Sequence, residues 1–290
     1  MPNRIKTPTP SPHSHGGRHS LLAMALAVVI NGCGAAPQSS SIAHDDRLDA
    51  ILWQTTSAEY HVLAKSIYAT ATLHLDRALA DRQWSALPEQ QDNFQQLPPA
   101  IIMDIDETVL DTGRFQSQLV KGRARFSTAV WRDWMSHNDP SAVPGALELI
   151  SFAQARGVTV FFITNRDQAT EATTRRHLGA VGIKLPTNID TVLCANERAD
   201  WGIDKGSRRR FIGQTHRVLM VFGDDLGDFI SEYRNPPAAR VKEAFKHSFW
   251  GTRWFMLPNP MYGSWEGSLY DFRSDLGLEG IAQKKADHLR

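Results

Sequence analysis

The chain has 290 residues, with 32 Lys and Arg against 31 Asp and Glu, and 42% of its residues are hydrophobic. This balance excludes a disordered chain, which would be poorer in apolar residues and more unevenly charged. It gives no sign of binding to a nucleic acid polymer, for which a basic domain is expected. No apolar run reaches the ~18 residues that a membrane-spanning helix needs.

The first 44 residues contain no Asp or Glu and are typical of an export signal. Three basic residues precede an unbroken apolar run at 21–30, which is the layout of a signal peptide. Residues 30–33, Ile-Asn-Gly-Cys, resemble the lipobox of bacterial lipoproteins. That resemblance implies cleavage before Cys33, a lipid on its thiol as a membrane anchor, and an outer-membrane address, because Gly34 rather than Asp follows. The alternative is an ordinary signal peptide in which Cys33 is incidental.

The rest of the chain alternates helices with short apolar strands. Apolar residues at helical spacing predict one long helix from Asp45 to about Arg82. Residues 113–141 interrupt the alternation and are predicted to form a small, mostly helical cap or insertion. Strands separated by helices predict an α/β fold in which helices cover both faces of a parallel sheet. The remaining predicted elements are strand 100–103, helix 144–156, strand 158–163, helix 168–178, and strands 189–193, 218–222 and 253–257.

These patterns divide the chain into three parts. Residues 1–32 are expected to be the signal peptide and residues 33–43 a flexible tether after the lipidated cysteine. The small, polar, Pro-containing composition of the tether favours flexibility. Residues 44–290 are expected to form the folded domain.

Polar side chains follow the predicted strands at the points where they end. In an open α/β sheet, ligands bind beyond the carboxyl ends of the strands. Clustered carboxylates at one point suit a hard divalent cation, Mg²⁺ above all, and a hydroxyl and a lysine suit phosphate oxygens. Taken singly, each residue is as easily a turn residue, a helix cap or a solvated charge. The candidate residues are Asp104, Asp106, Thr164, Lys205, Asp224 and Asp228.

The order of these motifs resembles that of the haloacid dehalogenase (HAD) superfamily. More narrowly, residues 102–111, 163–166 and 223–229 look like the class C acid phosphatases, the lipoprotein e group of bacterial 5′-nucleotidases. The similarity spans most of residues 50–270. It implies a Rossmann-like parallel sheet and an Mg²⁺-dependent phosphomonoesterase. One departure is Asp225, where the family usually has Asn, and which adds negative charge beside a predicted metal ligand.

The resemblance also implies a role for each candidate residue. Asp104 would attack phosphorus and form an aspartyl-phosphate, and Asp106 would act as general acid and then general base. Mg²⁺ would be held by the Asp104 side chain, the Asp106 backbone carbonyl and the Asp224 side chain. Thr164 and Lys205 would hold the phosphoryl oxygens. Asp228 would orient either Lys205 or a water on the metal.

Aromatic residues predict the kind of substrate. A nucleotide base or an aryl group needs a stacking surface, for which Trp131 and Tyr262 are the candidates; the alternative for both is core packing. The predicted substrates are nucleoside monophosphates and aryl phosphates. Two other functions stay open: a sugar-phosphate phosphatase on the same scaffold, and a ligand-binding surface lipoprotein with little catalytic activity. For Arg166 and Arg208 the alternatives are phosphate binding and structural ion pairs, and the ion pairs are favoured; Cys194 is predicted to be buried.

Overall fold

The computed structural model describes residues 45–289, and their centre is a five-stranded parallel sheet. The strands lie in the order β5–β4–β1–β6–β7, and each neighbouring pair is parallel. The predicted α/β fold is therefore confirmed. The predicted signal peptide, Cys33 and the tether lie outside the described residues. The strand bounds are Pro99–Met103 (β1), Thr159–Asp167 (β4), Val192–Ala195 (β5), Arg217–Gly223 (β6) and Trp254–Met256 (β7).

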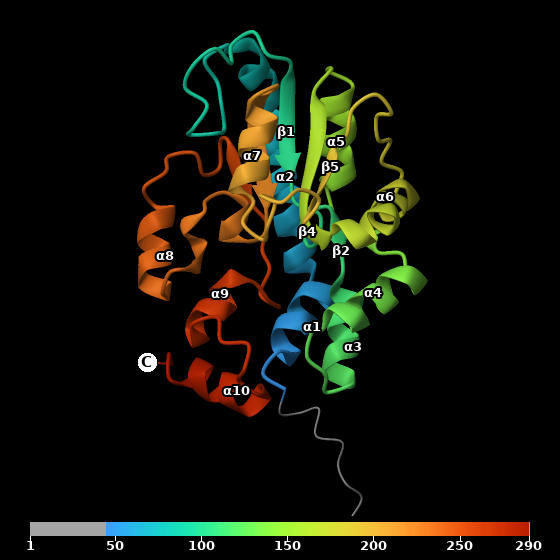
Figure 1. Cartoon of the computed structure of the whole chain (residues 1–290), viewed down its shortest axis with the longest axis vertical. Helices are drawn as coiled ribbons and strands as arrows, with labels where there is room; N and C mark the ends of the chain where they lie inside the picture. Colours follow the sequence, from blue (N-terminus) through green and yellow to red (C-terminus); the bar gives the residue numbers. More distant parts are fainter. Residues whose placement is uncertain (1–44, 290) are drawn as a thin grey trace, which may run out of the picture. The chain divides into compact units, whose positions relative to one another are not determined.

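Helices cover both faces of this sheet (Figure 1). Alternate residues of a strand point to opposite faces, and in β1 Ile101 joins one hydrophobic cluster whereas Ile102 joins the other. Because both faces are buried, the strands are continuous apolar runs. The helices of the first cluster are α2 (Ala58–Ala80), α5 (Ala146–Gln154) and α6 (Glu171–Ala180), and those of the second are α7 (Gly206–Gly213) and α8 (Pro237–Ala244).

The long helix predicted from Asp45 to Arg82 is two helices, α1 (Leu48–Thr56) and α2. Ser57 breaks it: its backbone is extended and its hydroxyl accepts the N–H of Tyr60 at 3.1 Å, which makes it the N-cap of α2. The periodicity of apolar residues conceals this break because α1 also buries one face. That face packs against the insertion rather than against the sheet, as the cluster around Ile51 shows.

Several other boundaries differ from the prediction. The strand expected at 158–163 continues to Asp167, so Thr164 and Arg166 lie within β4 rather than after it. The strand expected at 189–193 begins at Val192, whose N–H donates to the side chain of Asp190 at 3.0 Å in a turn that precedes the sheet. The helix expected to end at Gly179 continues to Ala180. The left-handed residue that follows it is Gly182, with a φ of 93°.

The insertion after β1 contains two helices framed by a small hairpin. Helices α3 (Gly113–Lys121) and α4 (Thr128–His137) lie between the paired strands β2 (Leu110–Asp111) and β3 (Ser141–Ala142). The hairpin was not predicted, because two-residue strands leave no periodicity. After β7 come α9 (Ser264–Gly267) and α10 (Leu278–Ala286). Within residues 45–289, none of the helices has the length and apolar character needed to cross a membrane.

Candidate active site

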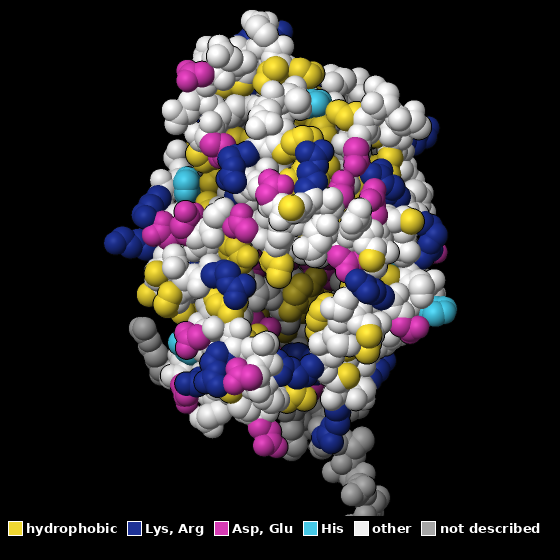
Figure 2. Space-filling model, in the orientation of Figure 1, with side chains coloured by type: hydrophobic (Ala, Val, Ile, Leu, Met, Phe, Trp, Pro, Cys, Tyr) yellow, Lys and Arg dark blue, Asp and Glu magenta, His cyan; other side chains and the backbone are white. Residues whose placement is uncertain are grey.

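A cleft of about 770 Å³ opens at the carboxyl ends of the central strands. Its lining includes both carboxylates that follow β1, the end of β4 at residues 165–167, Lys205 before α7, and the turn after β6. Figure 2 shows a hollow on this face, with hydrophobic side chains on its walls and Lys or Arg side chains at its rim. Four segments that are distant in sequence thus meet at one edge of the sheet, because parallel strands present their carboxyl ends together.

Asp104 follows β1 directly and forms a buried pair with a lysine. Its N–H donates to the carbonyl of Phe222 at 2.9 Å, which extends the β1–β6 ladder by one residue. Its carboxylate is ion-paired with Nζ of Lys205. The same Nζ donates to Oδ1 of Asp228 at 2.6 Å. All three side chains are buried, so Lys205 is held between two carboxylates.

Asp228 reaches Lys205 by folding back over Gly223 at the end of β6. A Cβ atom on Gly223 would lie 2.2 Å from Oδ2 of Asp228, so a larger residue there would displace that carboxylate. The same oxygen accepts the N–H of Asp225 at 2.9 Å, and Oδ1 of Asp225 accepts the N–H of Gly227 at 2.8 Å. These reciprocal bonds form a capping box that fixes the turn.

Asp106 is gripped by a buried arginine. Arg166 donates to its carboxylate from Nη2 at 2.7 Å and from Nε at 3.0 Å. The Arg166 side chain is 1% exposed and that of Asp106 is 20% exposed. The buried arginine therefore fixes the position of the carboxylate, which faces the cleft. His177 Nδ1 accepts a bond from Nη1 of Arg166 at 3.1 Å. Burial lowers the pKa of His177, which favours the neutral ring that can accept this bond.

Asp224 has a hydrogen-bond donor at each of its carboxylate oxygens. The hydroxyl of Thr108 donates to Oδ1 at 3.0 Å, and the side-chain amide of Asn259 donates to Oδ2 at 2.8 Å. Thr108 belongs to the turn after β1, and Asn259 follows β7. Three strands therefore fix the orientation of one carboxylate.

Carboxylates outnumber cations at this end of the cleft. Asp104, Asp224 and Asp228 each offer an oxygen, and these oxygens lie within 4.8 Å of one another. Burial raises the pKa of Asp104 to about 7, although Lys205 opposes this. Burial and the Asp104 charge likewise raise the pKa of Asp224 well above its usual range. Nearby, the backbone carbonyl of Asp106 accepts no hydrogen bond from the described residues. An all-oxygen set with excess negative charge fits a hard divalent cation such as Mg²⁺.

Aromatic rings line the outer part of the cleft. Trp131 of α4 stacks on Trp134 with ring centroids 5.4 Å apart, and Phe115 of α3 packs edge-on against it at 4.8 Å. The segment after β7 contributes Tyr262, whose hydroxyl donates to the buried carboxylate of Glu107 at 3.1 Å. The two residues predicted to stack on a substrate, Trp131 and Tyr262, thus line the same cleft.

Comparisons with known proteins agree with this geometry. The family model for acid phosphatases of the HAD superfamily, subfamily IIIB, matches residues 26–265. The chain belongs to this family. It is similar to two solved structures of the class C acid phosphatase from Bacillus anthracis, one of them with tungstate bound, at 29% and 30% identity and a TM-score of 0.73 for each. Both matches cover 85% of this chain and 97% of the other.

Membership in the acid phosphatase family confirms the resemblance drawn from the strand-end motifs. It makes the chain a phosphatase that acts on phosphomonoesters. The finer assignments, namely the metal, the substrate and the role of each side chain, are proposals that are argued from the geometry above.

Two residues have surroundings that the sequence did not indicate. Thr164 is fully buried and is not among the residues that line the cleft; its hydroxyl accepts the N–H of Arg166 at 3.1 Å. Arg208 was predicted to form an ion pair, which is wrong for the described residues. Its guanidinium instead donates to the carbonyls of Thr164 at 2.6 Å and Gly202 at 2.8 Å. Cys194 is buried, as predicted.

Three functional side chains of the phosphatase site were missed by sequence reasoning. They are Thr108 and Asn259, which hold Asp224, and Glu107, which holds Tyr262. A signal existed for Thr108, because it comes two residues after Asp106 in the same short polar run. Glu107 lies in the same run, but nothing there indicates its partner Tyr262, which is 155 positions away. Asn259 gave no such signal, since its partner Asp224 is 35 positions away in another turn.

Proposed function

We propose that this acid phosphatase is an Mg²⁺-dependent phosphomonoesterase that hydrolyses nucleoside monophosphates and aryl phosphates through an aspartyl-phosphate. The observation that carries the proposal is the different setting of two carboxylates that follow one strand. Asp104 lies beside Lys205 in the acidic cluster, whereas Asp106 is held by Arg166 and faces the cleft. The first setting suits a nucleophile and the second suits an acid and base.

The chemistry takes two displacements at phosphorus. In the first, an oxygen of Asp104 forms a bond to phosphorus as the bond to the leaving oxygen breaks, and Asp106 supplies a proton to that oxygen. In the second, Asp106 takes a proton from a water that attacks phosphorus, and the bond to Asp104 breaks. Arg166 keeps the Asp106 carboxyl group in one place through both steps.

Mg²⁺ would be held by the Asp104 side chain, the Asp106 backbone carbonyl and the Asp224 side chain. When bound, such a cation polarises the phosphoryl group and offsets the charge that develops on its oxygens. Thr108 and Asn259 orient Asp224 for this purpose. Asp228 is tied to Lys205 and to the turn after β6, so we assign it the orientation of Lys205.

Lys205 and Thr164 are proposed to hold the phosphoryl oxygens. Lys205 Nζ lies at the floor of the cleft beside Asp104 and carries a full charge. The hydroxyl of Thr164 accepts a bond from Arg166, and a hydroxyl that accepts one bond still has a proton to donate. The tungstate in the solved relative is a tetrahedral oxyanion like phosphate, which supports a phosphate site in this family.

The ring-lined part of the cleft supports substrates with a flat leaving group. The experiment that tests the proposal measures hydrolysis of nucleoside monophosphates, an aryl phosphate, sugar phosphates and a small aliphatic phosphate, each with Mg²⁺ and with excess chelator. We expect the nucleotides and the aryl phosphate to have the highest kcat/KM, and only with Mg²⁺. Faster hydrolysis of sugar phosphates would replace the substrate assignment. If no substrate is hydrolysed, the result would favour the alternative function, a ligand-binding lipoprotein with little catalytic activity.

We also propose that the phosphatase is an exported lipoprotein anchored in the outer membrane through Cys33. The support is the composition of residues 1–32, the lipobox-like residues 30–33, and Gly34. The test is fractionation of cells that express the full chain or its Cys33→Ser variant. The full chain should partition with membranes, and the variant should be released or remain unprocessed. A full chain found only in the soluble fraction would contradict the anchor.

A further inference from the structure

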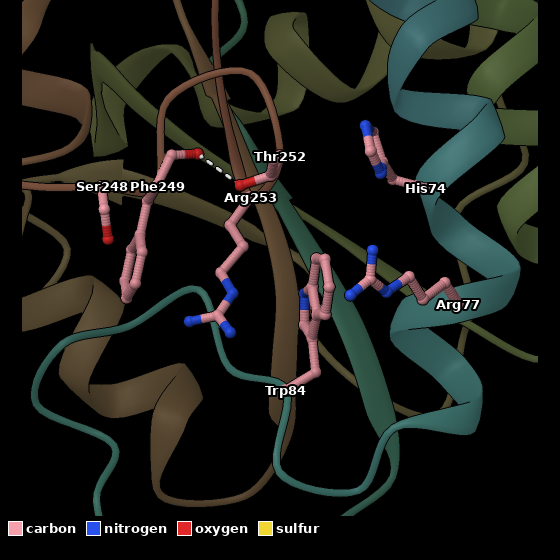
Figure 3. A pocket seen from close by; sticks show the side chains of 7 residues that line it. All are labelled: His74, Arg77, Trp84, Ser248, Phe249, Thr252 and Arg253. Atoms are coloured by element: carbon pink, nitrogen blue, oxygen red, sulfur yellow. Dashed lines mark hydrogen bonds between the residues drawn. The ribbon is translucent and has the colours of Figure 1, made fainter.

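A second cavity, of about 240 Å³, lies away from the cleft and is rich in positive charge. Its lining comes from three segments: His74 and Arg77 on α2, Trp84 in the loop after α2, and the loop 248–253 before β7 (Figure 3). Because Arg253 immediately precedes β7, the cavity is at the amino ends of the strands. It shares no lining residue with the cleft.

Trp84 is the fixed centre of this cavity. Its side chain is buried, and its indole N–H donates to the carbonyl of Leu219 at 2.8 Å. The pairing of β1 with β6 shifts register at this point, between Ala100 and Ile101. A register shift of this kind leaves a backbone group of the strand without a hydrogen-bond partner in the ladder. Here the Trp84 indole N–H bonds to the backbone carbonyl of Leu219. The indole is therefore held by the sheet rather than by the cavity.

Two arginines flank this indole, as Figure 3 shows. The guanidinium carbon of Arg253 lies 4.7 Å from the centroid of the Trp84 ring and 4.6 Å from that of Phe249, so rings cover the guanidinium from two sides. Arg77 lies 5.9 Å from the Trp84 centroid. Stacking occupies the faces of a guanidinium and leaves its in-plane N–H donors open. These in-plane N–H groups are the donors with which an arginine binds an oxyanion.

Both arginines contact aromatic rings, but in the described part of the chain neither is neutralised by an ion pair. Within residues 45–289, the guanidinium groups of Arg77 and Arg253 form no ion pair and donate no hydrogen bond. By contrast, Arg156, which follows the neighbouring α5, is paired with Asp76 at 2.6 Å. The carboxylate that acts on Arg253 is that of Asp81, and it already accepts a backbone N–H at 2.9 Å. Burial lowers the pKa of Arg253 despite Asp81, as expected for a charge with too little compensation.

We propose that this cavity is a second, non-catalytic binding site for a phosphate group, held by the in-plane N–H donors of Arg77 and Arg253 beside the Trp84 ring. The hydroxyl of Ser248 and the ring of His74 line the same space and are further polar contacts for such a ligand. The hydroxyl of Thr252 also lines it, but it donates to the carbonyl of Phe249 at 3.2 Å (Figure 3). The ligand is either free inorganic phosphate or the phosphate group of a small molecule. Two unpaired guanidinium groups favour a dianion over a monoanion such as acetate.

The Trp84 indole N–H is a local reporter for this site. The experiment titrates the full folded protein with inorganic phosphate at constant ionic strength and follows the indole N–H signals by NMR, with the Trp84 signal assigned through Trp84→Phe. We expect a saturable shift of that signal with a Kd in roughly the millimolar range or below. Arg253→Gln and Arg77→Gln should each weaken binding at least about tenfold. Arg82→Gln is the matched control, because Arg82 is exposed on the same loop and does not line the cavity.

Two further arms identify the source of the phosphate group. Glycerol phosphate, added to the Asp104→Asn variant so that it is not consumed, binds more tightly than inorganic phosphate if the natural ligand is a larger molecule, and less tightly if it is free phosphate. Acetate should shift the Trp84 signal much less. The proposal is overturned if phosphate leaves the signal unmoved, if acetate moves it equally, or if both arginine variants, with unchanged Tm, keep wild-type affinity. None of these outcomes depends on catalysis in the cleft.

Discussion

The two ends of the catalytic cleft are built in opposite ways. At the inner end, each polar side chain is fixed by partners from other strands: Lys205 contacts two carboxylates, and Asp224 receives two donors. At the outer end, the lining side chains are aromatic rings that pack on one another and still line the cleft. Trp131, for example, stacks on Trp134. Phe126, which also lines this end, is 60% exposed.

Under the proposed function, this difference would separate the chemistry from the choice of substrate. Every phosphomonoester brings the same phosphoryl group to the inner end, so a rigid and charged site serves all of them. The leaving group varies, and under the proposed function it would meet the rings, which would bind it by stacking and contact area rather than by directed bonds. Substitutions at the inner end should therefore affect all substrates alike. Substitutions at the outer end should affect substrates according to what they carry.

The largest effect is expected for Asp104→Asn. The amide is a poor nucleophile, so turnover should be abolished on nucleotides and on small phosphates alike. The fold should survive, because Asn has the same shape and removes one of three crowded carboxylates. The measurement is kcat on two substrates, with Tm as the control for folding. Residual activity within about tenfold of wild type would rule out the covalent mechanism.

Metal removal should follow closely in size. Excess chelator is expected to stop hydrolysis of every substrate, and Mg²⁺ should restore it. Full activity in excess chelator would contradict the proposed metal site.

The pKa of the acidic cluster gives the same prediction a second readout. Burial raises the pKa of Asp104 from 3.8 to about 7, so the folded state binds its proton more tightly than the unfolded chain does. Without metal, the free energy of unfolding should then fall as the pH rises through that interval. Added Mg²⁺ should raise Tm more at pH 7 than at pH 5, because it replaces the protons on the carboxylates. An equal rise in Tm at both pH values would argue against binding in this cluster.

The inner end was also the more predictable from sequence. Asp104, Asp106, Lys205 and Asp224 each follow or precede a strand or helix whose apolar pattern is clear, and parallel strands bring such ends together. The five strands were predicted for the same reason, with shifts at their ends. Local hydrogen bonds decide such shifts, as the side chain of Asp190 does before Val192.

Long-range contacts were beyond the reach of sequence patterns. The bond from Tyr262 to Glu107 joins two turns 155 positions apart, and nothing in either segment indicates the other. The break at Ser57 was hidden by periodicity that continues through it. The ion pair between Arg166 and Asp106 was missed for a third reason. An arginine near the end of a strand can pair with any nearby carboxylate, and the sequence does not say which one it contacts.

Removing a ring at the outer end should have an intermediate and selective effect. A base stacked on Trp131 or Tyr262 gains ~1–3 kcal/mol per stack, so Trp131→Ala and Tyr262→Ala should each lower kcat/KM for nucleoside monophosphates by roughly five- to hundred-fold. A small aliphatic phosphate should lose much less. Tyr262→Phe is the matched control, because it keeps the ring and removes only the bond to Glu107. Equal losses on both substrates would mean that the rings are structural.

The smallest effect on catalysis is expected at Asp225, where the family usually has Asn. Its charge was predicted to act on the neighbouring metal ligand. In the structure its carboxylate is committed to α9 and to its own turn: it accepts the N–H of Ser264 at 2.5 Å, the Ser264 hydroxyl at 2.7 Å and the N–H of Gly227 at 2.8 Å. We therefore expect Asp225→Asn to change the Mg²⁺ concentration for half-maximal activity by less than about threefold, since these donors offset the charge.

Stability should respond more than catalysis does. The amide of Asn has one acceptor oxygen, so either Ser264 or Gly227 loses its acceptor and faces an NH₂ group. An unpaired N–H costs about 1–3 kcal/mol, which corresponds to a fall in Tm of about 2–4 °C per kcal/mol for a domain of this size. Ser264→Ala is the control, because it removes the hydroxyl donor and keeps the N–H. A large change in Mg²⁺ dependence with an unchanged Tm would show that the Asp225 charge acts on the inner end of the cleft after all.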